Sequence, residues 1–167
     1  VREHVWATSW GVSTRLIGAA VMTHSDDDGL VLPPKIAPVQ VVIIPVFKDK
    51  DRAAVMGAVD TLAAQLKGHF RVKVDDREKM RPGAKYFEWE RKGVPLRLEV
   101  GPRDVANGAA FCKKRTGGDK FGIAFADVVA EVGRVLDEVQ LELLDAARDR
   151  LADRTYTVSS REEFAEK

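Results

Sequence analysis

Residues 40–47 read QVVIIPVF, and this apolar stretch decides the fold that the sequence predicts. A nearly continuous run of Val and Ile is typical of a strand that is covered on both faces, as in a parallel sheet. Asp49 or Asp51 can then begin a helix that runs to Gly68, a residue that favours a left-handed helix end. Apolar residues recur along this helix at helical spacing and predict one core-facing stripe. The stripe consists of Val55, Val59, Leu62 and Leu66.

Downstream of this helix, strand patterns and helix patterns alternate along the chain. Apolar and polar residues alternate where strands are expected, and apolar residues recur at helical spacing where helices are expected. The expected elements are strands over 70–74 and 96–100, a helix over 83–92, a hairpin formed by 108–115 and 120–125, and a long helix over 127–154. This order predicts an α/β domain with a mixed, mainly parallel sheet flanked by helices.

The residues upstream of QVVIIPVF are expected to form a separate unit. A turn and a helix are predicted over 9–24, with Ser13 or Thr14 as the capping residue, and 30–32 (LVL) predict a short buried strand. Three prolines between residues 33 and 38 cannot continue a helix or a central strand, so this segment is the expected domain boundary. The expected divisions are therefore 1–38, 39–154 and 155–167. Ser160 and Glu163 have the spacing of a capping box in the last of these.

Composition places the chain among ordinary globular proteins. Its 167 residues are 45% hydrophobic and 32% charged, which argues against wholesale disorder. No apolar run approaches the roughly 18 residues that span a bilayer, and nothing resembles a signal peptide, so a cytoplasmic protein without membrane contact is expected. The single cysteine, Cys112, excludes an internal disulfide and a Cys-pair zinc site, and the simplest expectation for it is a small buried residue. Three scattered histidines show no metal-ligand spacing, so no metal site is expected.

The charges are unevenly distributed although their sum is only +1. Residues 67–120 contain 15 basic and 8 acidic side chains, whereas 121–167 contain 6 basic and 11 acidic ones. A basic middle segment is the pattern expected of a face that binds a polyanion, although an ordinary solvated surface would look the same. Within it, the basic run of residues 113–115 is expected to contact phosphate or to face water, because such a run reads no base sequence.

Two stretches combine residue types that can carry chemistry. The first is TSWGVSTR, residues 8–15, where Gly11 allows close approach, Ser13 offers a hydroxyl and Arg15 a planar cation that can bind phosphate or stack on a base. Trp10 adds an apolar wall. A plain capped helix with an Arg facing solvent explains the same residues.

The second stretch is YFEWERK, residues 86–92, in which aromatic and charged side chains share a short helix. Flat rings stack on unpaired bases, and Tyr86 and Glu90 lie four residues apart on one helix face. Trp89 and Phe87 are instead expected in the core, because large aromatic residues are usually well buried. For Tyr86, a place in the core and a stacking surface are both open. Arg97 projects from the polar side of the next strand. Two further candidates, Arg103 and Asp104, follow that strand's end, where open α/β sheets place ligands.

Long strings of this sequence resemble a known family. SWGVSTRLIGAAVMTHSDDDGLVLPPKIAPVQVVIIPV, then VDDRE, then PGAKYFEWERKGVPLRLEVGPRD, are similar to the prolyl-tRNA synthetases, especially their archaeal/eukaryotic-like form. The resemblance covers essentially the whole chain. It implies that 1–38 are the last strand-helix-strand piece of a class II catalytic core, that 39–154 are an anticodon-binding domain, and that 155–167 begin a C-terminal extension.

The resemblance also implies site residues. Arg15 matches the arginine of the family's motif 3, which contacts ATP and has a catalytic role, and Ser13 matches a hydroxyl residue of the ATP site. Trp10 and Gly11 would help to form the proline pocket. The positions that match anticodon contacts are Tyr86, Glu90, Arg97, Arg103 and Asp104. Glutamate or aspartate together with arginine suits the edge of guanine, a base present in proline anticodons.

The activity implied by the resemblance is ligation of proline to tRNA(Pro), with ATP and Mg²⁺, by a homodimeric full-length enzyme. The chain is then expected to be a C-terminal fragment that binds tRNA weakly and catalyses nothing alone. A non-catalytic anticodon-domain paralogue that binds RNA or a partner is the alternative hypothesis. A nucleotide-binding domain of an oxidoreductase is disfavoured, because the turn FKDK at 47–50 lacks glycine.

Overall fold

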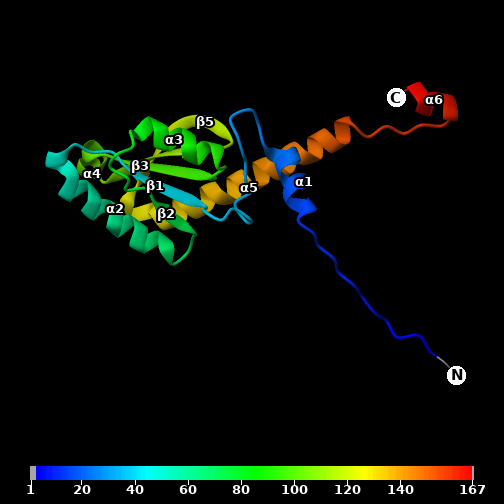
Figure 1. Cartoon of the computed structure of the whole chain (residues 1–167), viewed down its shortest axis with the longest axis horizontal. Helices are drawn as coiled ribbons and strands as arrows, with labels where there is room; N and C mark the ends of the chain where they lie inside the picture. Colours follow the sequence, from blue (N-terminus) through cyan, green and yellow to red (C-terminus); the bar gives the residue numbers. More distant parts are fainter. Residues whose placement is uncertain (1–2, 167) are drawn as a thin grey trace.

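The computed structural model describes residues 3–166, which form an α/β domain with two extensions (Figure 1). Its centre is a five-stranded sheet in the order β2-β1-β3-β4-β5. β1 pairs in parallel with β2 and β3, whereas β4 is antiparallel to both of its neighbours. The strands are β1 (Val41–Pro45), β2 (Val72–Val74), β3 (Leu96–Val100), β4 (Ala109–Lys114) and β5 (Gly117–Ala124). The expected mixed sheet is therefore confirmed.

Helices cover both faces of this sheet, which explains the continuous apolar run of β1. The helices are α1 (Arg15–His24), α2 (Arg52–Lys67), α3 (Pro82–Arg91), α4 (Pro102–Asn107), α5 (Val128–Asp153) and α6 (Arg161–Glu166). Val41 and Ile43 pack into the main core, to which α2 and α5 contribute their apolar stripes. Val42 and Ile44 face the other way, into a smaller core that contains Trp89 of α3. Every residue of β1 is buried as a result.

Several element ends differ from the sequence prediction for local reasons. The C-cap residue Gly68 has a right-handed backbone, with φ −70°, so the expected left-handed helix end is wrong. Thr14 stands at the N-cap of α1, but neither it nor Ser13 caps the helix, because no side-chain hydrogen bond is made there. The residues after β3 form the short helix α4, which was not expected from the sequence. Ser160 accepts a hydrogen bond from the Glu163 amide at 3.1 Å, in agreement with the expected helix start.

The short strand expected over 30–32 is absent from the described residues. The amide of Leu30 donates to the Arg91 carbonyl at 3.0 Å, and that of Leu32 donates to the Gly93 carbonyl at 3.3 Å. The segment therefore lies along the end of α3 rather than beside a strand. Gly93 has φ +72°, and a Cβ there would come within 2.8 Å of Leu30, so glycine is needed for this close approach.

Both ends of the chain extend away from the sheet (Figure 1). α1 lies beside the C-terminal half of α5, where Arg150 donates to the Thr23 carbonyl. None of the residues of α1 is buried. Cys112, by contrast, is fully buried in β4, where burial raises the pKa of its thiol to about 12, so the expectation for this residue is confirmed.

Candidate nucleic-acid interface

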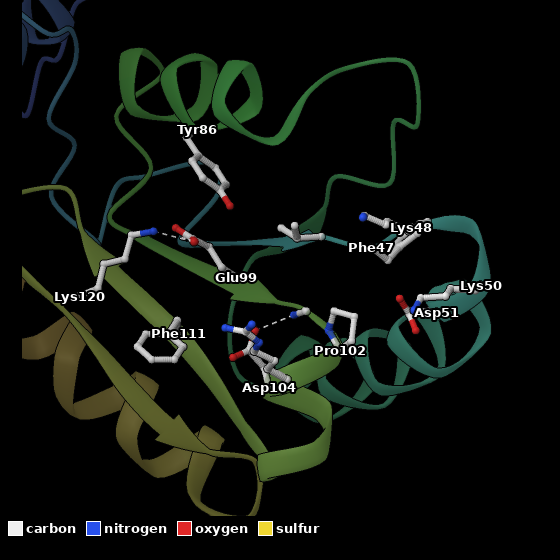
Figure 2. A pocket seen from close by; sticks show the side chains of 13 residues that line it. Phe47, Lys48, Lys50, Asp51, Tyr86, Glu99, Pro102, Asp104, Phe111 and Lys120 are labelled. Atoms are coloured by element: carbon white, nitrogen blue, oxygen red, sulfur yellow. Dashed lines mark hydrogen bonds and ion pairs between the residues drawn. The ribbon is translucent and has the colours of Figure 1, made fainter.

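An open pocket of about 800 Å³ lies at the carboxyl ends of the parallel strands β1 and β3 (Figure 2). This is the edge at which open α/β sheets bind their ligands. α3 supplies Tyr86 on one side, and β4 and β5 supply Phe111 and Lys120 on the other. The remaining lining residues belong to the ends of β1 and β3 or follow these strands in the chain: Val46, Phe47, Lys48, Lys50, Asp51, Glu99, Gly101, Pro102, Arg103 and Asp104.

Four side chains form one connected cluster at this pocket. The Glu99 carboxylate pairs with the Arg97 Nε at 3.1 Å and with the Lys120 Nζ at 2.7 Å. Arg97 and Lys120 both lie over the Tyr86 ring, at 4.3 and 5.3 Å from its centroid. Burial and the negative charge of Glu99 raise the pKa of Tyr86 to about 12. Tyr86 is therefore a neutral phenol at neutral pH, with its ring held by two cations.

The strand register explains why this cluster forms. Arg97 and Glu99 alternate with buried Leu residues along β3 and face the α3 side of the sheet. The partner of Glu99 on β4 is Phe111, and the partner of Arg97 is Lys113. A polar strip with one exposed ring therefore lies on a sheet face that the short helix α3 covers only in part.

The five residues expected to contact the anticodon fall into two adjoining groups. Tyr86, Arg103 and Asp104 line the large pocket. Glu90 and Arg97 line a narrow crevice next to it, between α3 and β4. The contact between the Arg97 guanidinium and the Tyr86 ring joins the two groups. Arg103 is exposed, whereas the side chain of Arg97 is only 12% exposed.

Asp104 has a second task within α4. Its Oδ2 accepts a hydrogen bond from the Gly101 amide at 2.7 Å, at the N-terminus of this helix. The carboxylate thereby satisfies a backbone donor that the helix itself leaves free. One of its oxygens is thus occupied before any ligand arrives.

The pocket includes residues that sequence reasoning did not select. Three of these residues are Glu99 from β3, Phe111 from β4 and Lys120 from β5. Phe111 stands between the buried residues Ala110 and Cys112, so its place on the open face could have been inferred from alternation. The turn FKDK at 47–50, whose lack of glycine argued against a nucleotide-binding site, contributes Phe47, Lys48 and Lys50 to the pocket lining.

The basic run at 113–115 was expected to contact phosphate or solvent, but two of its three side chains pair with acidic residues of the chain. Lys114 pairs with Glu138 and Glu142 of α5, at 2.9 and 2.5 Å, and so ties the hairpin to that helix. Arg115 is buried and pairs with Asp26, with one N–O distance of 2.8 Å. Neither cation is available to a phosphate.

Two of the aromatic expectations for α3 have opposite outcomes. Trp89 packs into the smaller core and donates from Nε1 to Asp75 at 2.7 Å, as expected for a core residue. Phe87 is 75% exposed, so its expected burial is wrong.

The first candidate stretch lies outside the pocket. Trp10 is almost fully exposed, and a Cβ added at Gly11 would meet no non-neighbouring atom within 4 Å. Ser13 precedes α1, which begins at Arg15. Among residues 3–166, no three His, Cys, Asp or Glu side chains lie close enough together to hold a metal ion. No helix in the same range is long and apolar enough to cross a membrane.

Comparison with known proteins identifies this type of domain. The family model described as "Anticodon binding domain" matches residues 40–134, a little over half of the chain and the whole of the pocket. The chain is 48% identical to the proline–tRNA ligase of Chloroflexus aurantiacus over 98% of its length, and 51% identical to that of Rhodopirellula baltica over 97%. It covers 35% and 33% of these relatives, so it spans about a third of their length.

The fold and the edge pocket thus define an α/β domain of the kind that binds tRNA anticodons. The chain belongs to the anticodon binding domain family. Its similarity to proline–tRNA ligases over nearly all of its length confirms the resemblance seen in the sequence.

Proposed function

We propose that this chain is the anticodon-reading part of a proline–tRNA ligase and that its partner is tRNA(Pro). The supporting observation is the pocket at the carboxyl edge of β1 and β3, which is lined by aromatic rings, carboxylates and several cations. Unpaired RNA bases stack on flat rings and offer their edges to such groups. All lining residues fall within the stretch that matches the anticodon-binding family.

Guanine suits this set of groups. Its N1–H and N2–H donate to a carboxylate, and its O6 and N7 accept from arginine. Glu90 and Asp104 are the proposed acceptors, and Arg97 and Arg103 the proposed donors. Tyr86 and Phe111 are the proposed stacking surfaces.

The whole ligase would activate proline with ATP and Mg²⁺ and transfer it to tRNA in the cytoplasm, as a homodimer. Arg15 and Ser13 are the residues of this chain that would contact ATP. An exposed arginine at the start of α1 fits that role, since a guanidinium can bind phosphate oxygens. Its contribution is positioning and charge stabilisation of the nucleotide. Trp10 and Gly11 would form part of the wall of the proline site.

The test is binding of an RNA stem-loop that carries a proline anticodon, followed by fluorescence anisotropy. Phe111→Ala should weaken binding by about 1–3 kcal/mol, the value of one base–aromatic stack. Phe87→Ala is the matched control, because Phe87 is an exposed phenylalanine of the same domain that does not line the pocket. It should leave the affinity unchanged.

Replacing the anticodon guanines of the stem-loop by adenines should also weaken binding to the unaltered chain. Equal affinity for the two RNAs would contradict the proposed function.

A further inference from the structure

Glu99 occupies the centre of the pocket cluster, yet its sequence position alone gave it no role. Its carboxylate contacts two cations at once, Arg97 from its own strand and Lys120 from β5. The side chain is only 13% exposed, and it lines the pocket directly (Figure 2). A carboxylate this well covered is held in place by its partners rather than by solvent.

The geometry requires a negative charge at this point. Arg97 and Lys120 approach the same Tyr86 ring, and two cations brought so close repel each other. Glu99 pairs with both of them and offsets that repulsion. Without Glu99, no ion pair would offset the repulsion between the two cations.

The pairing also fixes the direction of Arg97. Glu99 accepts from Nε, at one edge of the planar guanidinium, at 3.1 Å. The two Nη groups take no part in that hydrogen bond. A bidentate contact to guanine O6 and N7 needs two nitrogens in a fixed plane, which a rotating side chain does not offer.

We propose that Glu99 is a positioning residue for base selection: it holds Arg97 and Lys120 against Tyr86 so that the cations read guanine instead of binding phosphate. This role rests on the proposed function, since it assumes that the pocket receives anticodon bases. A released Arg97 would still bind RNA, because every phosphate attracts it. Removal of Glu99 therefore reduces selectivity more than affinity.

The experiment compares Glu99→Gln with Glu131→Gln in the full chain. Both changes remove one negative charge, and Glu131 pairs with Arg134 on α5, outside the pocket. Each variant is titrated with the proline anticodon stem-loop and with the loop in which adenines replace the guanines. Selectivity should fall at least about fivefold in Glu99→Gln, the lower end of a base-specific contact, and stay unchanged in Glu131→Gln.

The two failures can be told apart. If the unaltered chain prefers guanine and Glu99→Gln prefers it equally, the role of Glu99 is refuted while the proposed function stands. If the unaltered chain has no preference, the proposed function itself is refuted, and this inference with it.

A second readout needs no RNA. The chain has two tyrosines, so the tyrosinate absorbance can be assigned with a Tyr86→Phe variant. The pKa of Tyr86 should fall from about 12 in Glu99→Gln, because the nearby negative charge is gone, but not in Glu131→Gln. Identical titrations of the two variants would show that Glu99 does not hold this ring and would overturn the inference.

Discussion

Asp75, directly after β2, links this strand to α3. It is 2% exposed, and its carboxylate accepts from Arg77 Nη2 at 2.6 Å and from Trp89 Nε1 at 2.7 Å. The buried Lys85 donates to the Asp75 carbonyl at 2.9 Å. Burial alone would raise the pKa of Asp75, but the hydrogen bonds from Arg77 and Trp89 hold it well below the ordinary value.

Asp75→Asn should therefore destabilise the domain by about 3–5 kcal/mol at neutral pH, the cost of leaving buried partners without their charge. Because the folded-state pKa is depressed, this stabilisation is present above the unfolded pKa near 3.8 and is lost as the pH falls toward the folded value. Urea unfolding at several pH values measures both effects.

Asp76→Asn is the control for this change, since Asp76 is the exposed neighbour of Asp75. Its unfolding free energy should match that of the unaltered chain. If Asp75→Asn and Asp76→Asn unfold alike, the buried network does not stabilise the domain.

At the residue scale, residue type alone placed both Trp89 and Phe87 in the core and was right only for Trp89, and helical spacing explains the difference. Tyr86 and Trp89 lie three apart on α3 and both pack against the smaller core. Phe87 lies about 100° further round the helix and is exposed for that reason. Glu99 and Phe111 could not be joined from the sequence, because their contact depends on the register of β3 with β4.

At the scale of elements, Arg115 connects three segments that are distant in the chain. From the end of the β4–β5 hairpin it pairs with Asp26, and its Nε donates to the carbonyls of Leu30 and Glu90, both at 2.9 Å. The hairpin, the end of α3 and the segment after α1 are thus held by one buried guanidinium. A local pattern in the sequence could not predict this, because the partners lie 25 to 89 residues apart.

Asp26→Ala should cost about 1.5–3 kcal/mol, the range for hydrogen bonds that involve a charged group. The pKa of Asp26 is lowered by its hydrogen bonds with Arg115, so the paired form is the ionised carboxylate. Asp27→Ala removes an exposed neighbour in the same turn and should change stability little. Thermal unfolding of the two variants would measure the difference, and equal midpoints would contradict this account.

At the scale of the whole molecule, the apolar pattern of the sequence predicted the topology, whereas the count of charged residues did not predict which cations are exposed. The apolar run of β1 and the stripe of α2 predicted a covered parallel sheet, and both were confirmed. The excess of basic residues over 67–120 is larger than the number of cations that are free to contact a polyanion. Lys114 and Arg115 are engaged with acidic residues, while Lys48 and Lys50, outside that segment, line the pocket.

The salt dependence of RNA binding should depend on the lysines that line the pocket rather than on the total charge of the chain. Lys48→Ala should reduce the slope of log K against log salt by about 0.7 for each phosphate of single-stranded RNA that the lysine neutralises. Lys67→Ala removes the same charge at the far end of α2 and should leave the slope unchanged. Anisotropy titrations over a range of salt concentrations would measure both slopes, and a shared decrease would mean that only net charge matters.

The burial of Cys112 in β4 has a practical consequence. Because the thiol is sealed inside the sheet and resists ionisation, an alkylating reagent can modify it only in molecules whose sheet has opened. The rate of labelling at this single cysteine thus reports how often the domain opens, without an engineered probe, and RNA that binds the folded domain should slow the reaction.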